Sequence, residues 1–151
     1  MANPSKFTLE ARSEVEGYLK KKAYRIAVLH VGMYLQTRLG TLIRRSLDIK
    51  HESGRKKFNS VFDSQTLGTL LYLAHRAGMI TGSEKDKLQK VTELRNDVAH
   101  DLELWGDLKE TTKGAINYWC AWAMGFMEST DNRTKPVRKT RKGKPGYLDY
   151  P

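Results

Sequence analysis

Three polar side chains in one short segment, Arg95, Asn96 and His100, are the one credible active-site candidate in this sequence. An imidazole transfers protons near neutral pH because its ordinary pKa is about 6.5. A guanidinium keeps its charge, and its planar fork matches phosphate oxygens. We therefore take Arg95, Asn96 and His100 as the candidate catalytic residues, with Asn96 placed to orient either of the other two.

Helical periodicity gives Arg95 an unusual position. The apolar residues within about 60° of it on a regular helix are Leu88, Val91, Val98, Ala99 and Leu102. Burying an unpaired guanidinium is costly, so either a carboxylate such as Glu14 or Glu16 pairs with it, or this stripe lines a cleft or an interface. His100 points about 140° away from Arg95. The two side chains therefore meet only if the helix ends near Ala99 or if two copies of the chain face each other.

Apolar residues recur at helical spacing along nearly the whole chain, and β-type alternation is absent. This pattern predicts an all-α fold, an antiparallel bundle of four to five helices. We expect helices over about 8–22, 23–47, 64–78 and 81–99 and from 107 onward, with a polar connection over 50–59. Whether the first two are continuous through Lys20, Lys21 and Lys22 is left open. The predicted inward residues are Phe7, Ala11, Val15, Tyr18 and Leu19, then Ile26, Leu29, Met33, Leu35, Leu39, Leu42 and Ile43, and finally Leu108, Thr112, Ala115, Trp119, Trp122 and Phe126.

Several residues predict where helices begin and end. Ser64 and Asp107 are expected N-caps, and Gly78 is expected to end its helix in the left-handed conformation. Thr81 and Glu84 have the spacing of a capping box, which marks the start of the next helix.

The chain is strongly basic. Its 151 residues carry 27 Lys+Arg and 17 Asp+Glu, a net charge of +10, which favours polyanionic partners such as nucleic acid. We expect a helical bundle over residues 1–128 and a basic, proline-containing, extended tail over 129–151, acting either as a solubilising terminus or as a nucleic-acid or partner contact. The candidate nucleic-acid-binding residues are Arg55, Lys56, Lys57, Arg138, Lys139, Arg141 and Lys142.

Other chemistries have little support. No apolar run approaches the ~18 residues of a transmembrane helix, and no signal-peptide pattern is present, so we expect a cytoplasmic protein without a membrane partner. The single cysteine, Cys120, lies among tryptophans and is expected to be a core residue with a raised pKa. His30, His51 and His75 lack the spacing of a zinc site, so no metal and no cofactor are expected.

The segment Arg95-Asn96-Asp97-Val98-Ala99-His100 resembles the Arg-polar-x-x-x-His motif of the HEPN superfamily (higher eukaryote and prokaryote nucleotide-binding domains). Together with Leu67-Gly68-Thr69-Leu70, Ala77-Gly78-Met79-Ile80 and Leu88, it is similar to the bacterial HEPN-like group related to mannitol-operon repressors. The resemblance covers about 23–126 in helical layout, and its specific residues lie between Leu67 and His100.

This resemblance implies a homodimeric, metal-independent endoribonuclease of the toxin–antitoxin or phage-defence type. The ribose 2′-hydroxyl would attack the adjacent phosphorus, with His100 transferring protons, Arg95 on the phosphoryl oxygens and Asn96 orienting them. RNA would be the substrate, and an antitoxin or regulatory protein a further partner. The alternative is a non-catalytic HEPN-like regulator or adaptor that binds nucleic acid or a protein, in which the motif stabilises a dimer. A DNA-binding protein that uses the tail is a third hypothesis, although no clear helix-turn-helix signal is present.

Overall fold

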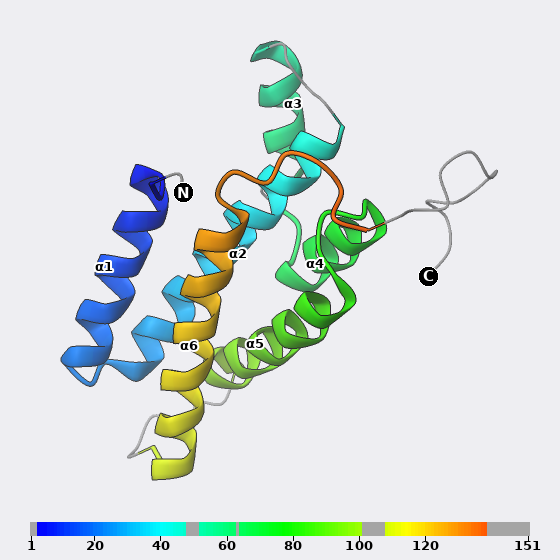
Figure 1. Ribbon diagram of the computed structural model, residues 1–151. Coiled ribbons are helices and arrows are strands. Elements are labelled where there is room, and N and C mark those ends of the chain that lie inside the picture. The colour runs from blue at the N-terminus through cyan, green and yellow to red at the C-terminus, as the bar shows by residue number, and fades with distance from the viewer. Residues whose placement is uncertain (1–2, 48–51, 63, 101–107, 139–151) are drawn as a thin grey trace. The chain divides into compact units, whose positions relative to one another are not determined.

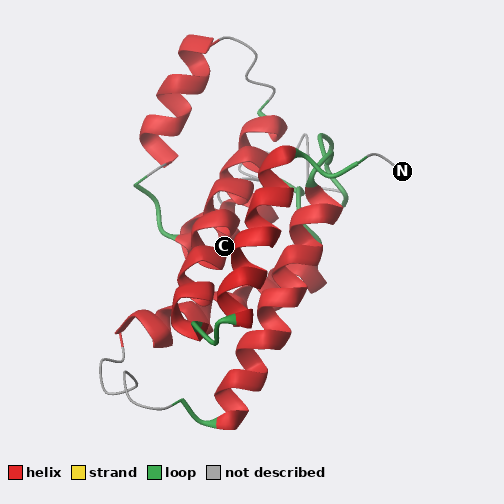
Figure 2. Cartoon of the chain, turned by 90° about the vertical axis from the view of Figure 1, so that its left-hand side faces the viewer, coloured by secondary structure: helices red, strands yellow, loops and turns green. Residues whose placement is uncertain are grey.

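The computed structural model describes residues 3–47, 52–62, 64–100 and 108–138. Over these ranges the chain forms six helices and no strand (Figures 1 and 2). They are α1 (Lys6–Lys20), α2 (Tyr24–Ser46), α3 (Glu52–Phe62), α4 (Leu67–Arg76), α5 (Gly82–His100) and α6 (Glu110–Thr130). The prediction of an all-α helical bundle is confirmed at this level, with one more helix than expected.

The additional helix is α3, which replaces most of the predicted polar connection. Phe58 and Phe62 lie four residues apart and stack with their ring centroids 4.0 Å apart, and Phe58 is buried. These two rings give a short, basic segment the apolar side that a helix needs. The predicted N-cap Ser64 is also wrong. α4 begins two residues later, where the Thr66 hydroxyl accepts a hydrogen bond from the Thr69 N–H at 3.1 Å.

Two helices end in the same left-handed motif. As predicted, Gly78 follows α4 with a φ of 74°, and the next N–H, that of Met79, bonds to the carbonyl of Ala74. At the end of α1, Lys22 takes a φ of 59°, so α1 and α2 are separate helices. The left-handed conformation costs a non-glycine residue roughly 1–2 kcal/mol. A helix end at Lys22 is therefore not predictable from the residue type alone.

The predicted capping box at the start of α5 is confirmed. The Thr81 N–H donates to Glu84 Oε1 at 2.8 Å, and the Glu84 N–H donates to Thr81 Oγ1 at 3.1 Å. The predicted N-cap Asp107 lies outside the described residues, and α6 begins after Lys109 without a side-chain cap.

The chain divides into two compact units. Unit 1 comprises Met1–Leu35 and Leu88–Asn132, and unit 2 comprises Gln36–Lys87 and Arg133–Pro151. In unit 1, α1 packs along α6 (Figure 1). The carboxylate of Asp131, just after α6, accepts hydrogen bonds from the Ser5 N–H, the Ser5 hydroxyl and the Thr8 hydroxyl, which fixes the start of α1.

The buried faces of α2 and α6 differ in part from the prediction. On α2, Ile26 and Met33 were expected to point inward, but they are 45% and 58% exposed. On α6, Trp119 and Trp122 are half-buried, and the buried positions are Ile116, Cys120, Ala123, Met124, Phe126, Met127 and Thr130. Side chains smaller than indole therefore fill the buried face of α6, and the two indoles lie at the edge of this face. This arrangement lets a neighbouring helix approach α6 closely.

Cys120 is buried, as expected. Loss of hydration on burial raises the pKa of its thiol to about 12, so the thiol stays protonated and packs as a small apolar side chain.

In unit 2, the segment after α6 lies against the connection between α4 and α5. Arg133 forms a bidentate ion pair with Glu84, in which Nη1 lies 2.9 Å from Oε1 and Nη2 lies 3.2 Å from Oε2. Its Nη1 also donates to the Met79 carbonyl at 3.0 Å. Arg45 of α2 donates to the carbonyl of Arg133. The Glu84 carboxylate therefore caps α5 and holds Arg133 at the same time.

Two further hydrogen bonds hold the segment after α6 against the end of α4. The Val137 N–H donates to the Gly78 carbonyl at 2.9 Å, and the Arg138 guanidinium donates to the carbonyl of His75. Both acceptors lie in the last turn of α4 or directly after it, where carbonyls lack partners within the helix.

One described helix, α2, is long and apolar enough to cross a membrane by length and composition. The expectation that no apolar stretch approaches this length is therefore wrong for α2. Half of its most apolar window is buried inside the protein, and core helices of soluble proteins pass the same test.

The pKa of His75 is lowered from its ordinary value of 6.5, first by burial and then by Arg138, Lys85 and Arg76, whose charges outweigh that of Asp86. The unfolded chain therefore binds this proton more tightly than the native protein. The neutral imidazole's contribution to stability is fully present above pH 6.5 and is lost as the pH falls from 6.5 through the lowered native pKa.

We expect the free energy of unfolding of the wild type to fall more steeply below pH 6.5 than that of His75→Gln. Urea unfolding at a series of pH values measures this difference, and the same substitution at the exposed His100 is the control. Parallel pH curves for wild type and His75→Gln would contradict it.

Candidate active site

Helix α5 places Arg95 on its inward side, as the periodicity predicted. The buried residues of α5 are Leu88, Val91, Thr92 and Val98, and Arg95 itself is half-buried between two of them, Val91 and Val98, along this stripe. The predicted neighbour Leu102 lies outside the described residues.

The stem of Arg95 packs against Gly32 of α2. A Cβ atom added at position 32 would lie 3.0 Å from Cγ of Arg95 and 3.4 Å from its Nε, closer than side chains normally pack. Gly32 is buried in the interior of a helix, where glycine is unfavourable by about 1 kcal/mol relative to alanine. Gly32 was not among the predicted site residues, although an isolated glycine inside an apolar helix is a recognised signal of close approach.

The tip of Arg95 turns toward its neighbour in the sequence. Its Nη1 donates to Oδ1 of Asn96 at 3.3 Å, and Asn96 is exposed. Arg95 thus buries its aliphatic stem and presents its charged end at the surface, as long basic side chains commonly do. The acceptor is a neutral amide, so this bond orients the guanidinium without neutralising its charge.

The proposed carboxylate partners do not pair with this guanidinium. Glu14 accepts from the Tyr34 hydroxyl, and its Oε1 lies 3.1 Å from Nδ1 of His30. Glu16 lies 3.9 Å from Nε of Arg12. Within the described part of the chain, no carboxylate lies within ion-pair distance of the guanidinium, so the prediction of an internal carboxylate partner is wrong for Glu14 and Glu16.

The cluster around Glu14 is a second group of titratable side chains. Burial and then the hydrogen bond to Glu14 raise the pKa of Tyr34 to about 12. The rings of Tyr18 and His30 lie 4.8 Å apart. Because Glu14 and Tyr18 are on α1 and the others on α2, we interpret the cluster as a polar contact that holds these two helices together.

His100 is exposed at the last residue of α5. As predicted, α5 ends near Ala99: its last residue is His100, which is still helical. Asn96 and His100 therefore share a face of the helix, four residues apart, while the Cα–Cβ bond of Arg95 points about 140° away from that of His100. The structure brings Arg95 and Asn96 together, and it places His100 on the face of Asn96 and away from Arg95.

The predicted nucleic-acid-binding residues fall in unit 2 or outside the described ranges. Arg55, Lys56 and Lys57 are exposed on α3, and Arg138 is half-buried in the segment 133–138 that follows α6. Lys139, Arg141 and Lys142 are not among the described residues. Over the residues that the structure describes, no group of three His, Cys, Asp or Glu side chains could hold a metal ion.

No family model, curated protein or solved structure matches this chain. Arg95, Asn96 and His100 therefore have to be interpreted from their own positions and contacts.

We expect Gly32→Ala to displace the stem of Arg95, since the new methyl group would lie 3.0 Å from its Cγ. The gain in helix propensity, about 1 kcal/mol, is then offset by overpacking of roughly 1–3 kcal/mol. Gly40→Ala is the matched control, because position 40 is in the same helix and has open space around it. We expect Gly40→Ala to stabilise the protein and Gly32→Ala to leave it less stable than this control, as measured by urea unfolding.

The Arg95→Ala background provides the second half of this test. With the stem removed, Gly32→Ala should stabilise the protein as much as Gly40→Ala does. Equal stabilisation by both alanines in the wild-type background would contradict the packing of Arg95 on Gly32.

Proposed function

We propose that this protein is a HEPN-like homodimer that cleaves RNA without a metal ion. The observation that supports this most is the state of Arg95, whose guanidinium is held at the surface by Asn96 and has no ion-pair partner among the described carboxylates. A guanidinium so oriented has most of its N–H donors left for an anion. The phosphate of an RNA backbone matches its planar fork and supplies the opposite charge.

The chemistry requires proton transfer beside this phosphate. A ribose 2′-oxygen attacks the adjacent phosphorus, the new 2′-O–P bond closes a cyclic phosphate, and the bond from phosphorus to the 5′-oxygen breaks. His100 accepts the proton of the 2′-hydroxyl, and the resulting imidazolium returns a proton, through solvent water, to the leaving 5′-oxygen, which restores the neutral imidazole. Arg95 stabilises the negative charge that builds up on the phosphoryl oxygens, and Asn96 fixes the guanidinium in place.

The site requires two copies of the chain. Because His100 and Arg95 point in different directions on a regular helix, we infer that Arg95 and Asn96 of one subunit act with His100 of the partner subunit. A two-fold dimer would contain two such sites. The exposed Ile26 and Met33 support a partner surface, since they lie on one side of α2, the helix that packs on Arg95.

The toxin or phage-defence role is the part of the proposal that depends on the resemblance alone. An enzyme that cuts RNA inside the cytoplasm has to be restrained, and an antitoxin or regulatory protein would be the restraining partner. The non-catalytic regulator or adaptor is the competing function, in which Arg95, Asn96 and His100 serve only to stabilise a dimer.

The shared site predicts complementation between two inactive variants. Arg95→Ala and His100→Ala should each abolish RNA cleavage in the presence of a chelator, because each removes one half of every site. When the two are mixed in equal amounts and allowed to exchange subunits, half of the dimers are mixed and each contains one intact site. Activity should return to about a quarter of the wild-type level.

Circular dichroism of each variant and mixing without subunit exchange are the controls. Two inactive variants that never complement each other would overturn the shared site. Two variants that cleave RNA as fast as the wild type would overturn the assignment of Arg95 and His100 to the site. A wild-type dimer that leaves RNA intact would overturn the ribonuclease and favour the adaptor.

A further inference from the structure

The positive charge of this protein is divided unequally between its two units. The described residues of unit 2 carry twelve Lys and Arg and three Asp and Glu, a net charge of +9. Those of unit 1 carry ten and eight, a net charge of +2. The candidate active site is in unit 1, so nearly all of the excess charge belongs to parts of the chain that the proposed chemistry does not use.

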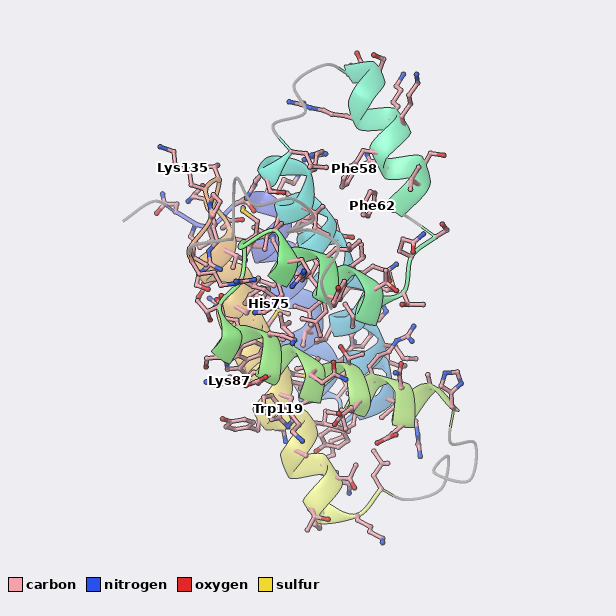
Figure 3. All side chains as sticks on the ribbon, turned by 90° about the vertical axis from the view of Figure 1, so that its right-hand side faces the viewer. Phe58, Phe62, His75, Lys87, Trp119 and Lys135 are labelled. Atoms are coloured by element: carbon pink, nitrogen blue, oxygen red, sulfur yellow. The ribbon has the colours of Figure 1, made fainter. Side chains whose placement is uncertain are left out.

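The exposed cations of unit 2 come from three separate segments. Arg55, Lys56 and Lys57 are on α3. Lys87 is on the first turns of α5, and Lys135 is in the segment that follows α6 (Figure 3). Three acidic residues of unit 2 are described: Glu84 is engaged by Arg133, and Glu52 lies 3.6 Å from Lys56 on the exposed surface of α3. Because twelve cations outnumber these three carboxylates, the described part of unit 2 keeps a net charge of +9, which attracts polyanions.

The segment that carries Lys135 is held in a defined place. Arg133 on one side of it bonds to Glu84 and to the Met79 carbonyl, and Arg138 on the other side bonds to the carbonyl of His75. Fixing both ends reduces the entropy that Lys135 loses when it binds a ligand.

The charged groups around His75 indicate that the electrostatic potential in this part of unit 2 is positive. Apart from burial, the groups that lower its pKa are the cations Arg138, Lys85 and Arg76, and one nearby carboxylate, Asp86, acts in the opposite direction. Three cations, from α4, from α5 and from the segment 133–138, thus all disfavour a positive charge on His75.

We propose that unit 2 binds the phosphate backbone of RNA through α3, the start of α5 and the segment 133–138, without reading the base sequence. This inference depends on the proposed function only for the identity of the polyanion. Unit 2 supplies the sequence-independent affinity, and Arg95, Asn96 and His100 in unit 1 supply the chemistry.

RNA fits this surface better than an anionic membrane does. A helix that inserts into a membrane surface needs exposed apolar side chains. On α3, Phe58 is buried and Phe62 is half-buried, and the two rings stack on each other on the same side of the helix (Figure 3). Among the large apolar side chains of α3, Val61 is the exposed one, with 58% of its surface accessible. Cations spread over three segments instead suit a long, flexible chain of phosphates.

The test uses two matched pairs of exposed lysines in the full-length protein. Lys56→Gln with Lys57→Gln removes two charges from unit 2, and Lys20→Gln with Lys21→Gln removes two from unit 1. Both are made in the His100→Ala background, so that the RNA stays intact, and binding of a fluorescent single-stranded RNA is followed by anisotropy at several KCl concentrations. Each lost phosphate contact lowers the slope of log affinity against log salt by about 0.7, so the unit 2 pair should lower it by about 1.4.

The unit 1 pair should leave the slope unchanged, and Lys87→Gln with Lys135→Gln should repeat the result of the α3 pair. An equal effect of the unit 1 and α3 pairs, or an effect of the unit 1 pair alone, would overturn the proposal. So would binding to phosphatidylserine vesicles without binding to RNA in the same buffer. If the slopes change as expected but the wild type never cleaves RNA, the unit 2 surface stands and the proposed function fails.

Discussion

The packing of Arg95 on Gly32 is the contact on which the candidate site depends. A guanidinium is too costly to bury alone, so its stem has to pass between helices while its charged end reaches the surface. Gly32 leaves the space for that stem, and Asn96 holds the end that emerges. Because the acceptor is a neutral amide, the charge of Arg95 is still available for a phosphate.

Local signals along the sequence predicted local structure well. The Thr81 and Glu84 capping box and the left-handed Gly78 are recognisable because each depends on residues within one helical turn. The half-buried position of Arg95 followed from the apolar stripe of its own helix. In contrast, the inward face of α6 was placed on Trp119 and Trp122, because the sequence of one helix does not reveal which of two apolar sides its neighbours cover.

The parts of the site that the sequence did not reveal depend on residues far apart in the chain. Gly32 precedes Arg95 by more than sixty positions, and nothing near either residue predicts that they touch. The unequal charge of the two units is hidden for the same reason. By chain order the excess positive charge is divided between the tail and the rest of the chain, whereas folding groups Arg133, Lys135 and Arg138 with the basic residues of α3 in one unit.

The central claim is that this protein cleaves RNA by attack of the 2′-hydroxyl, without a metal ion. The most direct measurement is an analysis of the ends produced when the purified protein is incubated with structured RNAs in excess chelator. We expect fragments with 2′,3′-cyclic phosphate and 5′-hydroxyl ends. Fragments with 3′-hydroxyl and 5′-phosphate ends, or intact RNA after prolonged incubation with the dimer, would contradict it.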